Sequence, residues 1–194
     1  MRRLITPILI IFLTAFEFHA QTTPQATPAK PVLDANQLAV GFLDRMNALD
    51  DWYISVDGKE EGVDQVVNRM MDLFAPDVIA EIPPHDEEQL GPVMLLGTTQ
   101  VRKWVEQIAR SQVTMTYICK RQTTKEFEGE YMIFSKPLPW GGLGVSFQII
   151  AASSLREDRR RYMEAGAVFL QVREDGKIQR LRLILSEKVE VTEQ

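Results

Sequence analysis

The sequence predicts an α+β fold in which three helices pack on a strongly curved antiparallel sheet. In the first part of the chain, apolar residues recur at helical spacing in three segments, at about 34–49, 63–74 and 98–110. After Arg110 the apolar period changes from 3.6 to 2, and alternating segments continue to about residue 190. Helices followed by a strand-rich half are typical of α+β domains.

Residues 1–20 have the features of a secretory signal peptide. Arg2 and Arg3 precede an apolar run from Leu4 to Phe16, and Ala20 supplies a small residue at the boundary. This run of 13 residues is shorter than the roughly 20 that a membrane-spanning helix needs. We therefore expect a secreted or periplasmic protein, cleaved near Ala20 and without stable membrane insertion afterwards. A retained anchor is the alternative.

Residues 21–32 form a Pro/Thr-rich linker, since they include Pro24, Pro28 and Pro31 and have no apolar face. The remaining residues, 33–194, are enough for one domain with a core of its own. The full chain has a net charge of −5, and loss of residues 1–20 makes it −6. A mildly acidic domain is not expected to bind nucleic acid.

The first helix is expected to begin after Asp34, which resembles a capping box with Gln37. Its apolar stripe consists of Leu38, Phe42, Met46 and Leu49. The following segment, 50–62, is irregular, with a turn signal at Asp57-Gly58. The second helix has the most regular stripe, Val63, Val66, Val67, Met70, Met71 and Phe74. Pro76 is expected to end it.

Two short strands and the third helix come next. The apolar segment 78–82 is broken by Pro83-Pro84, and the segment 93–96 is closed by Gly97. The third helix is capped by Thr98 or Thr99, and its stripe consists of Val101, Trp104, Val105 and Ile108. The later strands are expected at about 113–119, 128–135, 143–155, 161–173 and 177–190. The last two are joined by a hairpin turn at Asp175-Gly176.

Three segments carry a resemblance to a known superfamily: FAPDVIAEIPP at 74–84, GTTQVRKWVEQIA at 97–109 and VREDGKIQRLRLIL at 172–185. In this order they resemble the nuclear transport factor 2-like superfamily, in particular its SnoaL-like and ketosteroid-isomerase-like branch. The resemblance implies a cone-shaped domain with an internal cavity. It also implies a homodimer, because members often pair through their sheets. The superfamily contains enzymes and non-catalytic binders, so the fold does not identify an activity.

The catalytic positions of the isomerase branch fall on apolar residues here. The position of the base corresponds to Ile82, that of the helix tyrosine to Phe42, and that of the strand acid to Val168. The same kind of mechanism is therefore not expected, since it depends on carboxyl groups with tuned pKa values. These three residues are instead expected to line the cavity, together with Trp104 and Tyr117.

The remaining candidates for chemistry are few. His85 is the best single acid/base candidate, and Tyr53 and Glu81 are weaker ones. Glu81 would need a bulge to reach the cavity, because strand alternation turns it to the opposite face. The cluster His85 to Glu88 reads as a solvated loop, so no metal site is expected. Cys119 is expected to be a buried, inert thiol.

Four further residues each have two interpretations. Trp52 and Tyr53 either close the mouth of the cavity, or form an ordinary connection in which Trp52 fills the core. Gln148 and Arg182 interrupt apolar strands, so each either faces the cavity or marks a wet face of the sheet.

We therefore expect a small hydrophobic molecule to bind in the cavity without catalysis and without a cofactor. The alternative is a lyase, cyclase or isomerase-type enzyme that uses His85 or Tyr53. A third interpretation is an association module. The enzyme requires at least two ionisable side chains to converge within hydrogen-bond reach inside the cavity, which distinguishes it from the other two.

Overall fold

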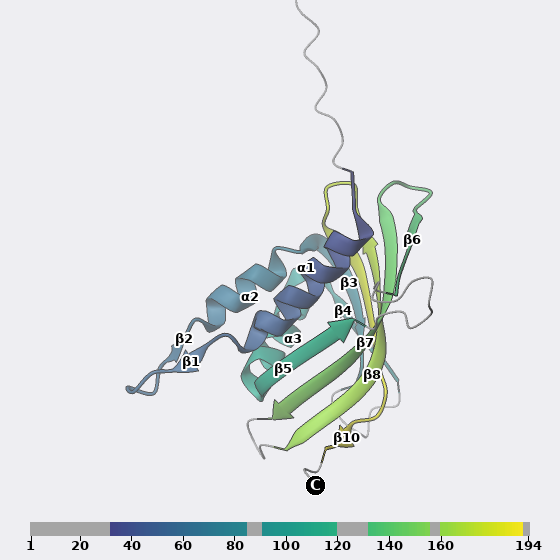
Figure 1. Cartoon of the computed structure of the whole chain (residues 1–194). Coiled ribbons are helices and arrows are strands. Elements are labelled where there is room, and N and C mark those ends of the chain that lie inside the picture. The colour runs from purple at the N-terminus through teal and green to yellow at the C-terminus, as the bar shows by residue number, and fades with distance from the viewer. Residues whose placement is uncertain (1–31, 85–90, 120–131, 156–159, 192–194) are drawn as a thin grey trace, which may run out of the picture.

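Three helices lie on one side of a strongly curved sheet (Figure 1), which confirms the predicted fold class. The structure is a computed structural model that describes residues 32–84, 91–119, 132–155 and 160–191. The helices are α1 (Ala35–Asn47), α2 (Val63–Met71) and α3 (Gly97–Ser111), and the 3-10 turn η1 (Ala48–Asp50) follows α1.

The sheet is mixed and mostly antiparallel. Its strands lie in the order β4 (Val93–Leu96), β3 (Phe74–Ile82), β9 (Ile178–Leu185), β8 (Arg161–Val172), β7 (Leu143–Leu155) and β5 (Gln112–Cys119). Two shorter strands join this sheet: β6 (Ile133–Pro137) pairs with β7, and β10 (Val189–Glu190) pairs with β8. A separate hairpin of β1 (Tyr53–Ile54) and β2 (Glu60–Glu61) occupies part of the segment predicted to be irregular and projects away from the sheet.

The start of α1 agrees with the capping pattern in the sequence. The Asp34 carboxylate accepts a hydrogen bond from the backbone N–H of Gln37 at 2.9 Å. The helix then buries Ala39, Phe42, Leu43 and Met46. In α2 the buried residues follow the predicted stripe up to Met71.

The second helix ends earlier than predicted. It stops at Met71, and Phe74 opens β3 instead of closing the helix. The reason is that β3 pairs with β9 through a register shift between Phe74 and Ile79. Pro76 lies within that shift, where β3 has no paired residue on β9, so its missing N–H removes no hydrogen bond between these strands. The proline therefore marks an irregularity in a strand.

The sheet is mostly antiparallel, as predicted, but the pairing of β3 with β9 is parallel, which the sequence did not predict. Side-chain alternation has the same period in both pairings, so the pattern of apolar residues carries no information about strand direction. The last predicted strand is also divided. The ladder with β8 stops at Leu185, and the chain pairs again only as β10.

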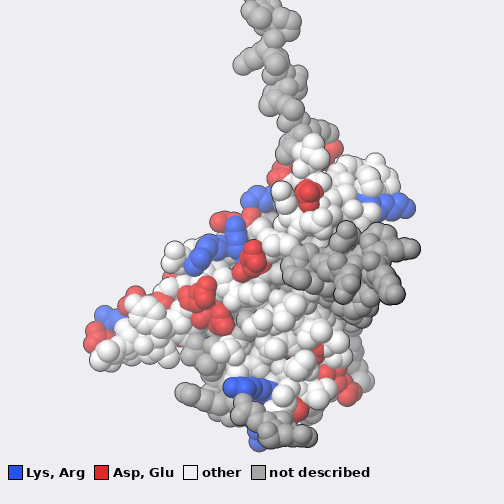
Figure 2. Space-filling model, in the orientation of Figure 1, with Lys and Arg blue, Asp and Glu red and all other residues white. Residues whose placement is uncertain are grey.

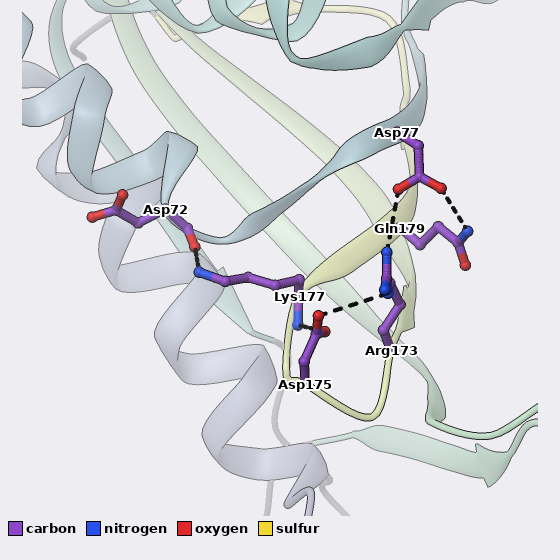
Figure 3. Close-up of polar contacts among 6 residues, drawn as sticks. All are labelled: Asp72, Asp77, Arg173, Asp175, Lys177 and Gln179. Atoms are coloured by element: carbon purple, nitrogen blue, oxygen red, sulfur yellow. Dashed lines mark hydrogen bonds and ion pairs between the residues drawn. The ribbon is translucent and has the colours of Figure 1, made fainter.

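A polar network ties the turn between β8 and β9 to the beginning of β3 (Figure 3). Asp77 accepts a hydrogen bond from Gln179 at 3.2 Å and forms an ion pair with Arg173 at 3.5 Å. The Lys177 ammonium donates to the backbone carbonyl of Asp72. These groups are exposed, so each contact adds little free energy. Together they hold the irregular β3–β9 junction in register.

The interior between the helices and the sheet is filled with apolar side chains along most of its length. Phe42 from α1 meets Phe147 from β7 edge to face, with 6.4 Å between ring centroids. Both rings are almost completely buried, as are Ile82 and Val168. The interior around these four side chains is therefore packed core.

None of the described helices has the length and apolar composition that crossing a membrane requires. Acidic and basic side chains are interspersed on the face shown in Figure 2.

Two glycines should respond in opposite ways to alanine. Gly41 in α1 has open space where a Cβ would stand, so Gly41→Ala should stabilise the fold by about 0.5–1 kcal/mol through helix propensity. A Cβ on Gly166 in β8 would lie 2.2 Å from the carbonyl oxygen of Ile184. Gly166→Ala should therefore cost about 1–3 kcal/mol or more, because backbone must move. Urea denaturation measures both changes. An unchanged free energy of unfolding in Gly166→Ala would contradict the close approach of β8 to β9.

Candidate functional site

A cleft of about 280 Å³ lies between α3 and the inner face of the sheet. Its walls come from α3, from strands β5, β7, β8 and β9, and from segments next to β3 and β9. The lining residues are Pro83, Pro84, Trp104, Gln107, Ile108, Ser111, Tyr117, Ala151, Ser153, Glu164, Leu183, Leu185 and Lys188. The volume is close to the lower limit of ordinary ligand pockets. The cleft therefore suits a compact molecule.

Tyr117, Ala151 and Glu164 form one row across the sheet at this cleft. Tyr117 on β5 is paired with Ala151 on β7, and Ala151 is paired with Glu164 on β8. Residues paired in this way project from the same face, and two strand spacings place the outer two about 9.5 Å apart at the backbone. Because the middle residue is alanine, the phenol and the carboxyl extend over it into the same space.

Burial raises the cost of ionising both acidic groups of this row. Burial raises the pKa of the Tyr117 hydroxyl far above its usual value, and the negative charge of Glu164 raises it further. Burial also raises the pKa of Glu164, while the nearby Lys188 ammonium lowers it in part. Tyr117 therefore stays protonated at neutral pH, and the Glu164 carboxyl keeps its proton to a higher pH than an ordinary glutamate does.

Within the described part of the chain, neither the Tyr117 hydroxyl nor the Glu164 carboxyl forms a hydrogen bond or a close ion pair. Groups of this kind in a protein interior normally have a partner. Both face the cleft, where a ligand or water can reach them. They are the polar groups that a bound molecule would contact.

Asn47, at the end of α1, fixes the backbone at Tyr117. Its side-chain amide donates to the Tyr117 carbonyl at 3.1 Å and accepts from the Tyr117 N–H at 2.6 Å. In the described sheet β5 ends the strand order, so this amide takes the place of a neighbouring strand there. The contact holds the residue that carries the phenol.

The residues expected to line the cavity divide into three groups. Trp104 and Tyr117 lie at the cleft. Phe42, Ile82 and Val168 face the same interior but belong to the packed core beyond the cleft. The remaining expected residues, Trp52, Tyr53, Gln148 and Arg182, lie elsewhere.

Gln148 and Arg182 lie on the outer face of the sheet. The buried residues of β7 are the odd-numbered ones, so Gln148 is exposed. Arg182 forms an ion pair with Glu81 at 3.1 Å on the same outer face, next to β3. The expectation that either one points into the cavity is corrected by strand parity. Parity also leaves Glu81 on the outer side, as expected without a bulge.

Trp52 is a core residue and Tyr53 is 65% exposed on β1. The Trp52 indole donates to the backbone carbonyl of Ala109 at 2.9 Å, which fixes it beneath α3. Neither residue lines the cleft, so the interpretation of Trp52 as a core-filling side chain describes the structure. His85 lies outside the described residues.

Trp52→Phe should lower the free energy of unfolding by about 1–3 kcal/mol, because the buried carbonyl of Ala109 loses its donor. Chemical denaturation measures this loss. The same variant should leave ligand affinity unchanged, since Trp52 does not line the cleft. If Trp52→Phe kept wild-type stability but bound ligand more weakly, both the buried position of Trp52 and its position outside the cleft would be contradicted.

Glu164 and Lys188 were not among the site residues predicted from the sequence. Glu164 was detectable, because it lies four residues before Val168 on the same strand and therefore shares its face. Lys188 had no such signal, since an unbroken strand to residue 190 was expected there.

In the described residues no group of three or more His, Cys, Asp or Glu side chains is placed to hold a metal ion. Burial raises the pKa of Cys119, as expected for an inert thiol.

The pKa of Glu164 predicts a pH-dependent effect of Glu164→Gln on stability. The folded state holds this proton more tightly than the unfolded state, so the wild-type side chain increasingly destabilises the fold as pH rises through its raised pKa. The melting temperature of Glu164→Gln relative to wild type should therefore increase between about pH 4 and pH 8. Thermal melts at several pH values check this, with Glu61→Gln on the exposed β1–β2 hairpin as the control. A relative melting temperature that does not change with pH would contradict it.

Comparison with known proteins identifies the fold. No protein-family model and no curated protein sequence matches the chain. Among solved structures, a protein from Novosphingobium aromaticivorans provisionally assigned as a scytalone dehydratase matches with a TM-score of 0.57 at 14% identity, over 82% of this chain and 88% of that one. An NTF2-like protein of unknown function from Exiguobacterium matches with a TM-score of 0.51 at 11% identity, over 77% and 98%. The chain has the nuclear transport factor 2-like fold.

A third structure with this fold is a computationally designed binder of 17-OHP, with a TM-score of 0.53 at 14% identity, over 81% of this chain and 98% of that one. The nuclear transport factor 2-like structures that resemble the chain thus include both a designed binder and proteins named as enzymes. At these identities the likeness shows the fold only. Any function must therefore be inferred from the residues of the cleft between α3 and the sheet, and not from the fold alone.

Proposed function

We propose that the protein is exported and binds a compact, mostly apolar molecule in the cleft beside α3. The observation that carries this proposal is the row Tyr117–Ala151–Glu164, which presents two polar groups without partners in the described part of the chain. Trp104, Ile108 and Leu183 supply apolar contact around them. A concave site that combines apolar surface with a few convergent polar groups is typical of small-molecule sites.

Native mass spectrometry of protein purified from its source tests binding directly. We expect a co-purified small molecule, and its occupancy should fall in Tyr117→Phe and in Glu164→Gln. Tyr53→Phe is the matched control, because it removes the same hydroxyl from an exposed position. Retention of the molecule by both cleft variants, or no bound molecule in any preparation, would count against the proposal. Sequencing the N-terminus of the purified protein tests export, which requires a mature end near Ala20.

The second candidate is an acid/base enzyme that uses Glu164 and Tyr117 in place of His85 or Tyr53. Tyr117 and Glu164 both line this cleft, and no hydrogen bond joins them in the described residues, so this candidate requires that a bound molecule bridge the two groups. A carboxyl whose pKa is raised by burial keeps its proton to a higher pH than usual, which suits a general acid, and Tyr117 lines the same cleft and can donate a hydrogen bond to the same molecule. Conversion of the co-purified molecule by wild type, with binding but no conversion by Glu164→Gln, would favour the enzyme over the binder.

We also propose that two copies pair through the outer face of the sheet. Ile118, Ile150 and Ile184 are exposed there, and the pairing register places Ile118 beside Ile150. Phe169 and Met163 on β8 extend the same apolar surface. Light scattering should give a dimer mass for wild type and a monomer mass for Ile150→Lys. A wild-type monomer would rule the dimer out.

A further inference from the structure

The cleft combines apolar side chains with titratable ones. Trp104 and Ile108 of α3 and Leu183 and Leu185 of β9 supply apolar surface, next to the uncharged polar side chains of Gln107, Ser111 and Ser153. The titratable side chains are those of Tyr117, Glu164 and Lys188. Lys188 is the only positively charged residue among the described residues that line the cleft. The cleft thus offers both apolar surface and several hydrogen-bond donors.

The interruption between β9 and β10 places Lys188 beside Glu164. After Leu185 the chain leaves the ladder, and Ser186 secures it to β8 through two hydrogen bonds with Ala165: its N–H donates to the Ala165 carbonyl at 2.8 Å, and its hydroxyl accepts from the Ala165 N–H at 3.1 Å. β10 then pairs with the beginning of β8. Lys188 lies between these two attachments.

The Lys188 ammonium interacts electrostatically with Glu164 but makes no direct ion pair with a described residue. Its Nζ atom lies 6.0 Å from the centre of the Tyr162 ring. Glu190, which is close in sequence, is paired with Arg160 instead. The ammonium is therefore free, within the described residues, to contact a ligand at the same end of the cleft as Tyr117 and Glu164.

We propose that the ligand is a compact monocarboxylate, with its apolar body against α3 and β9 and its carboxylate among Tyr117, Glu164 and Lys188. The proposal rests on the proposed binding function of the same cleft and adds the chemical class of the ligand. With Glu164 protonated, all three side chains donate hydrogen bonds and the site has a net positive charge, which matches an acceptor-only anion. With Glu164 ionised, two carboxylates would lie side by side.

Binding should therefore take up a proton at Glu164. In the described residues, the titratable groups that face Glu164 are Tyr117 from β5 and Lys188 from the segment after β9. The lining residues of α3, β7 and β9 carry no charge. A bound anion next to Glu164 favours its neutral form. The affinity for a carboxylate should consequently fall as the pH rises through the pKa of Glu164.

Calorimetry with benzoate and with uncharged benzyl alcohol tests the proposal. Benzoate stays ionised between about pH 5.5 and 8, so any change in its affinity over this range reports on the protein. We expect benzoate to bind more tightly at the acidic end, with proton uptake revealed by buffers of different ionisation enthalpy. Benzyl alcohol should bind with little pH dependence.

Three variants separate the roles of the groups. Lys188→Gln should weaken benzoate binding by about tenfold or more and leave benzyl alcohol unchanged. Glu164→Gln should retain benzoate binding and lose its pH dependence. Lys136→Gln, on β6 and away from the cleft, is the matched control for loss of a positive charge.

The failures of the two proposals are distinguishable. If benzyl alcohol binds but benzoate does not, or if Lys188→Gln leaves benzoate affinity unchanged, the carboxylate proposal is overturned and the binding cleft stands. If neither probe binds at any pH, both the ligand class and the binding function of the cleft are rejected.

Discussion

Phe42→Ala is expected to lower the free energy of unfolding by about 3–5 kcal/mol. The ring is 2% exposed and lies edge to face with Phe147, at the centre of the interior between α1 and the sheet. Its removal takes away apolar contact and leaves a cavity that helices and strands cannot close without moving. Urea denaturation measures the loss through the midpoint, provided that the slope stays at its wild-type value.

Phe134→Ala is the control for this measurement. Phe134 lies on β6 and is 59% exposed, so the same substitution should change stability by no more than about 0.5 kcal/mol. A loss of less than about 1 kcal/mol in Phe42→Ala would mean that the interior around Phe42 is an open cavity, as the family resemblance suggested.

Ala151→Leu is expected to weaken binding of either probe by at least about tenfold while the protein remains folded. Ala151 stands between Tyr117 and Glu164, and a longer side chain there would occupy the space that both groups share. The cleft has room for the added atoms, so the overpacking strain of a filled core does not arise. Calorimetry gives the affinity, and a thermal melt verifies the fold.

Ala152→Leu is the matched control, because it makes the same change at the next residue of β7, on the opposite face of the strand. Its probe affinity should equal that of wild type. Equal losses in the two variants would indicate a general disturbance of β7, and wild-type affinity in Ala151→Leu would place the ligand elsewhere.

The sequence predicted the order of the elements well because each depends on local periodicity. The change from a period of 3.6 to 2 after Arg110 coincides with the end of α3 at Ser111. Parity along a strand is equally local, and extending it from Val168 would have identified Glu164. The same parity explains why Glu81 and Arg182 meet on the outer face.

The features that escaped prediction depend on pairing between distant segments. The parallel alignment of β3 with β9 leaves no mark on either strand, and its register shift turned an expected helix end at Phe74 into the start of a strand. The break at 186–188 depends on the attachment of Ser186 to β8, so the position of Lys188 was hidden for the same reason. The placement of Trp52 beneath α3 likewise depends on a contact with Ala109, 57 residues away.

The packed core around Phe42 and the row through Ala151 consist of different residues. Phe42, Phe147 and Val168 belong to the hydrophobic core, whereas Glu164 and Lys188 line the cleft and are not part of it. A lineage can therefore exchange the groups at the cleft, and so change which molecule is recognised, without first acquiring compensating changes in the core. Such separation gives one scaffold room to diverge in specificity while its stability is inherited intact.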